Sequence, residues 1–167
     1  YAKVHSNASA PLQEAMELAY LTGQRPGDVL RYSIQDIRDN NLTVRQGKTA
    51  KKLRIEITGE LASLVDRIKA RRKEIDKTRV VAMALIVKED GTPLTASALR
   101  SRFDKARELA GIEKEAFQFR DLRAKAGTDK ADSDDILAAR KQLGHASVTM
   151  TEAYVRNRKG EKVKPTR

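Results

Sequence analysis

The sequence predicts a mainly helical α+β domain with a small three-stranded antiparallel sheet. Several segments carry apolar side chains at the helical period, whereas residues 33–58 alternate apolar and polar side chains as strands do. The 167 residues suit a single domain that buries most of its apolar surface, and the absence of cysteine excludes disulfides and thiolate metal sites. An apolar core must therefore hold the domain together.

The N-terminal third of the chain predicts two helices and then the sheet. Residues 11–21 form one apolar helical face and Gly23 stands where that helix would end, while Pro26 can open a second, short helix with Asp28 in its first turn. His5 lies before these elements, in a terminus that we expect to be frayed. Three alternating runs, separated by polar turns, then predict the strands: Ile34, Asp36 and Arg38; Leu42 and Val44; Leu53, Ile55 and Ile57.

The rest of the chain predicts helices joined by one apolar segment. Residues 59–74 combine an apolar face with a basic remainder, and residues 82–87 form either a buried strand or an apolar link. Thr95 caps a further helix, which Gly111 ends. Two more helices are predicted over 119–130 and 134–143, the second capped by Asp132 or Ser133, and Ser147 caps a last helix that runs to about Arg156. The polar residues 157–167 are expected to form a mobile, basic tail.

The charge balance points to a polyanionic partner. Lys and Arg total 34 against 23 Asp and Glu, a net charge of +11 at pH 7, although a basic surface can also serve solubility alone. Aromatic residues make up only 4% of the chain and Trp is absent, so contact with the backbone of a duplex fits better than stacking on single-stranded bases. The longest apolar run, residues 80–87, is far shorter than the ~20 residues of a membrane span. We expect a cytoplasmic protein with no membrane role.

Four short segments carry residues that suit phosphate chemistry. They are Thr22-Gly-Gln-Arg25-Pro-Gly-Asp28, Gln46-Gly-Lys48-Thr49, Phe119-Arg120-Asp-Leu-Arg123, and Leu143-Gly-His145-Ala-Ser147 followed by Tyr154. Their order and spacing resemble the tyrosine recombinase family, which includes the phage integrases similar to lambda integrase. That family has an Arg after a helix-ending Thr-Gly, a hairpin Lys, His-x-x-Arg, Leu-Gly-His and a Tyr nine residues further on, as Tyr154 is here.

The resemblance covers residues 12–156 and implies the same fold and an activity. It implies a site-specific DNA recombinase that integrates or excises a phage or mobile element through a 3′-phosphotyrosine intermediate, without metal, ATP or another cofactor. Residues 1–156 would be the catalytic domain, and the DNA-binding domains that family members carry before it would lie outside this chain. The implied partners are duplex DNA and DNA-bending accessory proteins, and the full-length form would be a tetramer on two DNA sites, whereas the isolated domain can be a monomer. The implied location is the bacterial nucleoid.

The resemblance also implies a role for each motif residue. Arg25, Arg120 and Arg123 would hold the phosphate, because planar guanidiniums pair their N–H groups with nonbridging oxygens. Tyr154 would attack phosphorus, Lys48 would protonate the leaving 5′-oxygen, and His145 would bind a phosphate oxygen or help to deprotonate Tyr154. Asp28 would hold Arg25 in position. Lys51 and Lys52 are the alternatives to Lys48 as the proton donor. Arg120 stands where the family usually has His, and an Arg cannot act as a base at neutral pH.

Two other functions stay open: a non-catalytic DNA-binding domain that kept the fold, and a type IB topoisomerase. A two-metal nuclease lacks acidic residues at ligand spacing. Gly47-Lys48-Thr49 is not the end of a nucleotide-binding loop, because position 42, where that motif needs glycine, is Leu. Further candidates for phosphate contact are basic residues on the predicted helices, namely Lys69, Arg71, Arg72 and Arg102.

Overall fold

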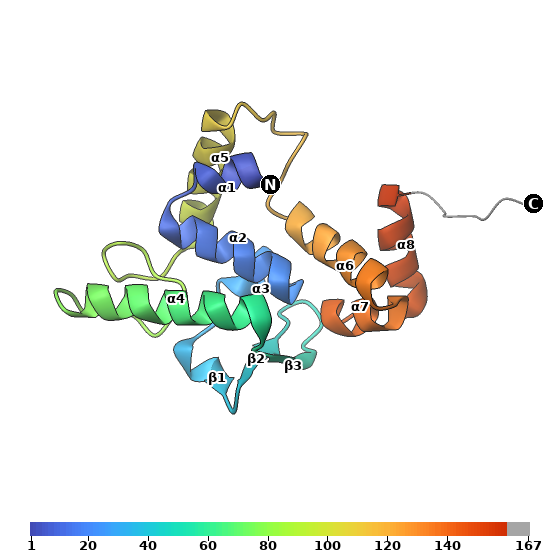
Figure 1. Cartoon of the computed structure of the whole chain (residues 1–167), viewed down its shortest axis with the longest axis horizontal. Helices are drawn as coiled ribbons and strands as arrows, with labels where there is room; N and C mark the ends of the chain where they lie inside the picture. The colour runs from blue at the N-terminus through green and yellow to red at the C-terminus, as the bar shows by residue number, and fades with distance from the viewer. Residues whose placement is uncertain (160–167) are drawn as a thin grey trace, which may run out of the picture.

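A computed structural model of the protein describes residues 1–159 and the side chains of residues 1–155. Within that part of the chain, eight helices and one three-stranded antiparallel sheet form the structure (Figure 1), which confirms the predicted fold class. Most of the predicted basic tail, residues 160–167, lies outside the described residues. None of the described helices is both long and apolar enough to cross a membrane.

The N-terminal helices are α1 (Ala2–Ser6), α2 (Ala10–Thr22) and α3 (Pro26–Val29). Gly23 ends α2 with φ 66°, as the sequence predicts. The prediction of a frayed terminus is wrong: His5 lies in α1, and its Nε2 is 2.9 Å from Glu17 Oε1 on α2. Val4 is buried beside it. The His5–Glu17 contact and the burial of Val4 hold α1 in place, because a helix of this length is not stable alone.

The sheet contains β1 (Ile37–Arg38), β2 (Asn41–Arg45) and β3 (Lys52–Glu56) in the order β1-β2-β3. The first predicted strand is shorter than expected because residues 34–36 form a 3₁₀ turn. Ser33 Oγ accepts from the N–H of Gln35 at 3.2 Å, and Asp36 Oδ2 accepts from the N–H of Ser33 at 2.8 Å. This capping box competes successfully with strand formation.

The later helices confirm the predicted order, with ends shifted by a few residues. They are α4 (Gly59–Asp76), α5 (Ala96–Leu109), α6 (Asp121–Ser133), α7 (Ile136–Leu143) and α8 (Val148–Lys159). Thr95 caps α5 by accepting from the N–H of Ala98 at 3.2 Å. The predicted caps of α7 are wrong, because α6 continues through Ser133 and Asp135 accepts from the N–H of Ala138 at 2.7 Å instead.

Residues 82–87 form an apolar link, not a strand of the sheet, and Leu85, Ile86 and Val87 are buried. Two arginines of α4 hold this link. Arg72 donates to the carbonyl oxygens of Ala82 and Ala84, and Arg71 donates to that of Val87.

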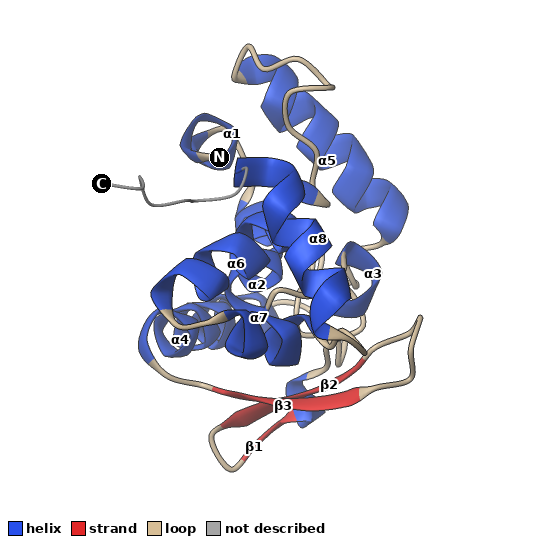
Figure 2. Ribbon diagram, turned by 90° about the vertical axis from the view of Figure 1, so that its right-hand side faces the viewer, coloured by secondary structure: helices blue, strands red, loops and turns tan. Residues whose placement is uncertain are grey.

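α2 lies at the centre of the molecule and contacts α1, α3, α4, α5 and α6. The sheet runs along one edge of the helical body (Figure 2), and α6, α7 and α8 pack against one another beside it. Leu12, Met16 and Leu18 of α2 are fully buried in the core. The C-terminal end of α2, the β2–β3 hairpin and the end of α7 consequently meet, and three of the four motif segments lie there.

Candidate active site

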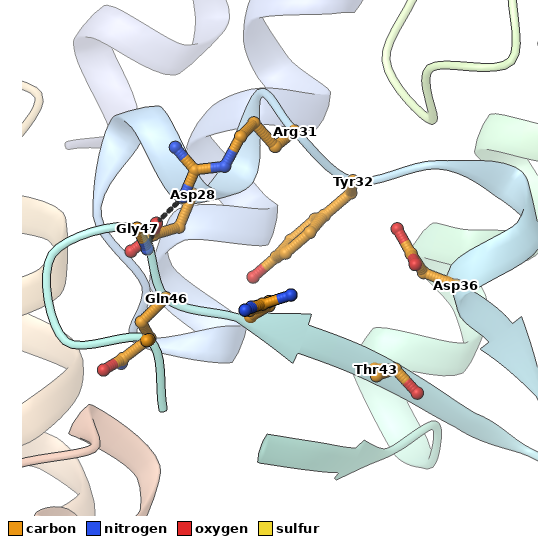
Figure 3. Close-up of a pocket in the computed structure, with 9 residues that line it drawn as sticks. Asp28, Arg31, Tyr32, Asp36, Thr43, Gln46 and Gly47 are labelled. Atoms are coloured by element: carbon orange, nitrogen blue, oxygen red, sulfur yellow. Dashed lines mark hydrogen bonds and ion pairs between the residues drawn. The ribbon is translucent and has the colours of Figure 1, made fainter. Parts of the chain in front are cut away.

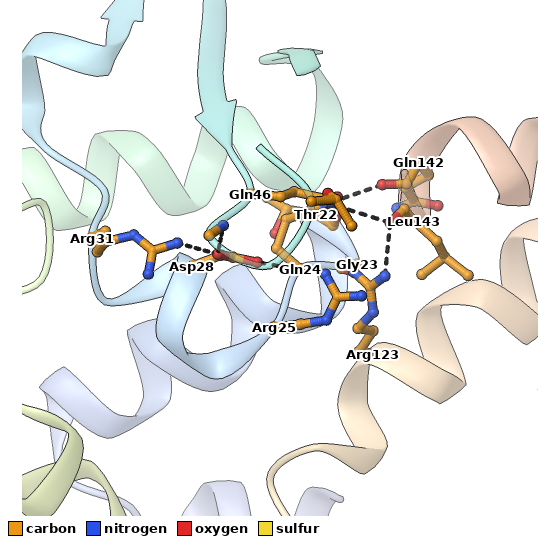
Figure 4. A network of polar contacts seen from close by, with 12 residues as sticks. Thr22, Gly23, Gln24, Arg25, Asp28, Arg31, Gln46, Arg123, Gln142 and Leu143 are labelled. Carbon is orange, nitrogen blue, oxygen red and sulfur yellow. Dashed lines mark hydrogen bonds and ion pairs between the residues drawn. The ribbon is translucent and has the colours of Figure 1, made fainter. Parts of the chain in front are cut away.

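Arg123 ties together segments that are far apart in the sequence. Its Nη1 donates to the carbonyl oxygen of Gly23 at 2.6 Å, and its Nη2 donates to that of Leu143 at 2.7 Å (Figure 4). Burial, followed by the charge of Arg25, lowers the pKa of Arg123 to about 10, while Tyr154 opposes this effect by its charge and a side-chain hydrogen bond. A guanidinium in this position gains stability from any anion that approaches it.

Arg25 and Asp28 face each other across the start of α3. Arg25 Nη1 lies 4.0 Å from Asp28 Oδ2, and both atoms are buried without a hydrogen-bond partner among the described residues. The other oxygen, Asp28 Oδ1, accepts from Arg31 and from the N–H of Gly47 at 2.9 Å. Asp28 therefore provides Arg25 with a counter-charge, while the Arg25 side chain as a whole stays partly exposed.

His145 follows Gly144, which ends α7 with φ 68°. Its Nδ1 lies 3.0 Å from Thr151 Oγ1, and its ring meets the ring of Tyr154 edge-on with centroids 5.7 Å apart. Burial, then the charges of Arg123, Arg25 and Lys51, lowers the pKa of His145 to about 4. The imidazole is consequently neutral at pH 7, with one N–H and one lone pair.

The β2–β3 hairpin brings lysines to the same place. Lys48 and Lys51 are exposed in the loop, and the charge of Lys51 reaches His145. Lys52 begins β3 and pairs in register with Arg45. Lys48 makes no side-chain hydrogen bond or ion pair within the described residues, so its ammonium is available to a substrate.

Arg120 is exposed at the start of α6 and lines a groove of about 860 Å³. Pro26 and Gly27, the residues after Arg25, line the same groove together with residues of α5 from Ala96 to Arg107. Three further cations, Arg100, Arg107 and Lys114, also line it, and Arg107 is paired there with Asp104 at 2.8 Å. Arg100, Lys114 and Arg120 make no ion pair or side-chain hydrogen bond within residues 1–155, whose side chains the structure describes.

Three of the four further candidates for phosphate contact bind other groups of this protein through hydrogen bonds. Arg71 Nη2 donates to Glu14 Oε2 at 2.6 Å, Arg72 holds the apolar link, and Arg102 donates to both carboxylate oxygens of Glu89 at 2.7 and 2.6 Å. Lys69 is exposed on α4. No regularity of the sequence separates paired from unpaired cations, because the partners come from other elements.

Two glutamines at the centre of the site have no role predicted from the sequence. Gln24 and Gln46 are fully buried, and Gln46 Nε2 donates to Gln24 Oε1 at 2.7 Å. Their positions next to Arg25 and within Gln46-Gly-Lys48 were visible, but the burial that gives them importance was not. Within the described residues, no group of three or more His, Asp or Glu side chains is placed to hold a metal ion.

Comparison with known proteins finds relatives over most of this chain. The integrase of Escherichia phage HK022 is 31% identical over 149 residues, which cover 86% of this chain and 40% of that integrase. The integrase of Escherichia phage lambda is 34% identical over 164 residues, which cover 92% of this chain and 44% of that integrase. The chain thus spans less than half the length of these relatives.

Solved structures agree with this comparison. The lambda integrase tetramer bound to a Holliday junction superposes with a TM-score of 0.83 at 26% identity, over 98% of this chain and 49% of that one. The lambda integrase catalytic core superposes with a TM-score of 0.75 at 27% identity, over 87% of this chain and 91% of that one. Residues 1–161 match the Phage integrase family, and the chain therefore belongs to this family of tyrosine recombinases.

Proposed function

We propose that this chain is the catalytic unit of a site-specific DNA recombinase, an integrase that cuts and rejoins duplex DNA through a covalent bond to Tyr154. The observation that carries the proposal is the position of Tyr154, edge-on to His145 and within reach of the Arg123 guanidinium. A tyrosine beside two buried cationic or polar groups that can bind phosphate is suited to attack a phosphodiester.

Arg25, Arg120 and Arg123 bind the scissile phosphate in this proposal. The partly exposed guanidinium of Arg25 and the remaining N–H groups of Arg123 supply donors for nonbridging oxygens. Negative charge grows on those oxygens in the transition state, and preorganised donors stabilise it more than they stabilise the ground state. His145 adds either an N–H donor or a lone pair, since it is neutral at pH 7.

The chemical step balances without an external energy source. The phenolic oxygen of Tyr154 forms a bond to phosphorus while the P–O5′ bond breaks and its electron pair leaves with the 5′-oxygen. Lys48 gives that oxygen a proton, and the phenolic proton passes to His145 or to solvent. Rejoining is the reverse: a 5′-hydroxyl attacks the phosphotyrosine, and Tyr154 leaves and regains its proton.

We propose that the DNA backbone on one side of the scissile phosphate runs along the groove that Arg120 lines. Pro26 and Gly27, directly after Arg25, line this groove together with Arg100 and Lys114. These unpaired cations fit a row of phosphates, because each neutralised phosphate releases condensed counterions. Lys69 stays a candidate for a more distant contact.

The wider assembly is part of the same proposal. Lambda integrase has been solved as a dimer on a core site and as a tetramer on a Holliday junction. We propose that the protein containing this chain works as a tetramer on two DNA sites, with further DNA-binding domains and with accessory proteins that bend the DNA.

A covalent-capture experiment tests the proposed function. Nicked duplexes of randomised sequence, whose cleavage releases a short fragment, are incubated with the chain in EDTA, and adducts that survive denaturant are sequenced. We expect adducts with the wild type and none with Tyr154→Phe. No adduct with either protein, including a longer protein that contains this chain, would favour a non-catalytic DNA-binding domain. Supercoil relaxation without strand exchange would favour a type IB topoisomerase.

A further inference from the structure

The loop that carries Lys48 has little apolar support. A pocket of about 410 Å³ lies between the hairpin and the segment from α3 to the 3₁₀ turn, and Gly47 and Tyr32 line it together (Figure 3). Gly47, Lys48, Thr49 and Lys51 are exposed. A loop over an open pocket takes its position from polar contacts and not from packing.

Gln46, at the start of this loop, makes those contacts with two other motif segments (Figure 4). Its Nε2 donates to Gln24 Oε1 at 2.7 Å, next to Arg25, and to the carbonyl oxygen of Leu143 at 2.9 Å, two residues before His145. Gln24 in turn donates to the carbonyl oxygens of Thr22 and Gln142 at 2.9 and 2.7 Å. One buried carboxamide therefore joins the hairpin to the turns that present Arg25 and His145.

The residues on both sides of Lys48 are fixed through the same network. Thr49 Oγ1 donates to Gln46 Oε1 at 2.7 Å, and the N–H of Gly47 donates to Asp28 at 2.9 Å. The N–H of Gln46 also closes the loop by donating to the carbonyl oxygen of Lys51 at 2.9 Å. Lys48 is thus a free side chain on a backbone held at each neighbouring residue.

We propose that Gln46 is a positioning residue, whose carboxamide holds the Lys48 loop so that the ammonium reaches the leaving 5′-oxygen. The inference rests on the proposed function, since it assumes that Lys48 protonates that oxygen. Gln46 has no role of its own in the chemical step in this proposal, and it acts on Lys48 through the loop that it ties to Gln24 and Leu143. Its loss leaves Lys48 present and misplaced, and a displacement of about 1 Å costs on the order of a hundredfold in rate.

A substrate whose leaving group needs no proton distinguishes a misplaced Lys48 from general damage to the active site. Replacing the bridging 5′-oxygen of the scissile phosphate by sulfur makes the leaving group a thiolate, a much weaker base that departs unprotonated. On the normal duplex, at a site recovered by covalent capture, we expect Gln46→Ala to cleave ~10- to 100-fold more slowly than wild type. On the thio-substrate, Gln46→Ala and the benchmark Lys48→Ala should both cleave at close to the wild-type rate.

A pair of substitutions at Thr49 provides the test if Gln46→Ala fails to fold. Thr49 is exposed, so neither variant disturbs the core. Thr49→Val removes the hydroxyl that donates to Gln46 Oε1, whereas Thr49→Ser keeps it. Thr49→Val should be slower on the normal duplex and near wild type on the thio-substrate, and Thr49→Ser should behave as wild type on both.

Failure of the inference and failure of the proposed function give different results. If wild type cleaves and Lys48→Ala recovers on the thio-substrate, but Gln46→Ala or Thr49→Val stays equally slow on both substrates, Gln46 is merely structural and the inference is wrong. Wild-type rates for these variants on the normal duplex would overturn it as well. If wild type forms no adduct on either substrate, the proposed function fails and the inference fails with it.

Discussion

Asp28 Oδ1 accepts a 2.9 Å hydrogen bond from the backbone N–H of Gly47, so one carboxylate serves both the helix that follows Arg25 and the loop that carries Lys48. Asp28 is 4% exposed and also faces the guanidiniums of Arg25 and Arg31. Removing a buried partner leaves the opposite charge without compensation, which is more damaging than losing a surface pair.

Asp28→Ala should lower the free energy of unfolding by about 2–3 kcal/mol, less than for a fully buried pair because Arg31 is exposed. Asp28→Asn, which keeps an acceptor for Gly47, should cost less. Urea unfolding measures both, with Glu74→Ala as the control, since its pair with Lys77 is exposed and contributes at most ~1 kcal/mol. Equal losses for Asp28→Ala and Glu74→Ala would show that the carboxylate has no special structural role.

Gly144→Ala tests how closely the end of α7 packs against the hairpin. A Cβ at Gly144 would lie 2.6 Å from the amide atoms of Gln46, and the residue has φ 68°. Gly111 has a similar φ of 65° with nothing within 4 Å of its Cβ position, so Gly111→Ala isolates the backbone strain. Gly111→Ala should destabilise by ~1 kcal/mol and Gly144→Ala by ~1–3 kcal/mol more, in urea unfolding. Equal values would mean that Gln46 moves aside without cost.

The lowered pKa of His145 makes stability depend on pH in one direction. The unfolded histidine titrates near 6.5 and the folded one at about 4, so between these values the unfolded chain binds more protons. The free energy of unfolding should therefore fall as pH drops from 6.5 to 4, by at most ~1.4 kcal/mol per pH unit from this group. Unfolding of wild type and His145→Asn across this range measures the difference. Parallel curves would contradict the shifted pKa.

Arg100 and Lys114 should account for part of the salt dependence of DNA binding. Each cation that meets a phosphate adds ~0.9 to the slope of log affinity against log salt, so each Ala variant should flatten that slope by about that amount. Lys73, which is exposed on α4, provides the control. Fluorescence anisotropy with a labelled duplex gives the slopes. A slope changed equally by Lys73→Ala would place the DNA elsewhere, and Lys69→Ala in the same series tests the remaining candidate.

The sequence predicted the helices, the hairpin and the motif residues because each leaves a local signal. Periodicity, Gly23 at the end of α2 and the spacing between His145 and Tyr154 are all visible along the chain. The chemical roles of Arg25, Lys48, Arg120, Arg123, His145 and Tyr154 stay predictions that the proposed experiments test.

The remaining errors came from contacts between elements that are distant in the sequence. Helix α1 exists because His5 meets Glu17, and the basic face of α4 is partly internal because Arg71 meets Glu14 and Arg72 meets the link. Gln46 illustrates the same limit. An amide two residues before a lysine has no distinguishing pattern until the fold buries it against Leu143.

The order of the motif segments along the chain has a consequence for synthesis. Arg25 and the hairpin leave the ribosome early, whereas Tyr154 belongs to α8, the last helix described. A nascent chain thus holds Arg25 and Lys48 long before it holds the nucleophile. Under the proposed function, an incomplete translation product that stops before α8 is unable to break DNA, and a cell carrying such fragments is spared stray cuts in its chromosome.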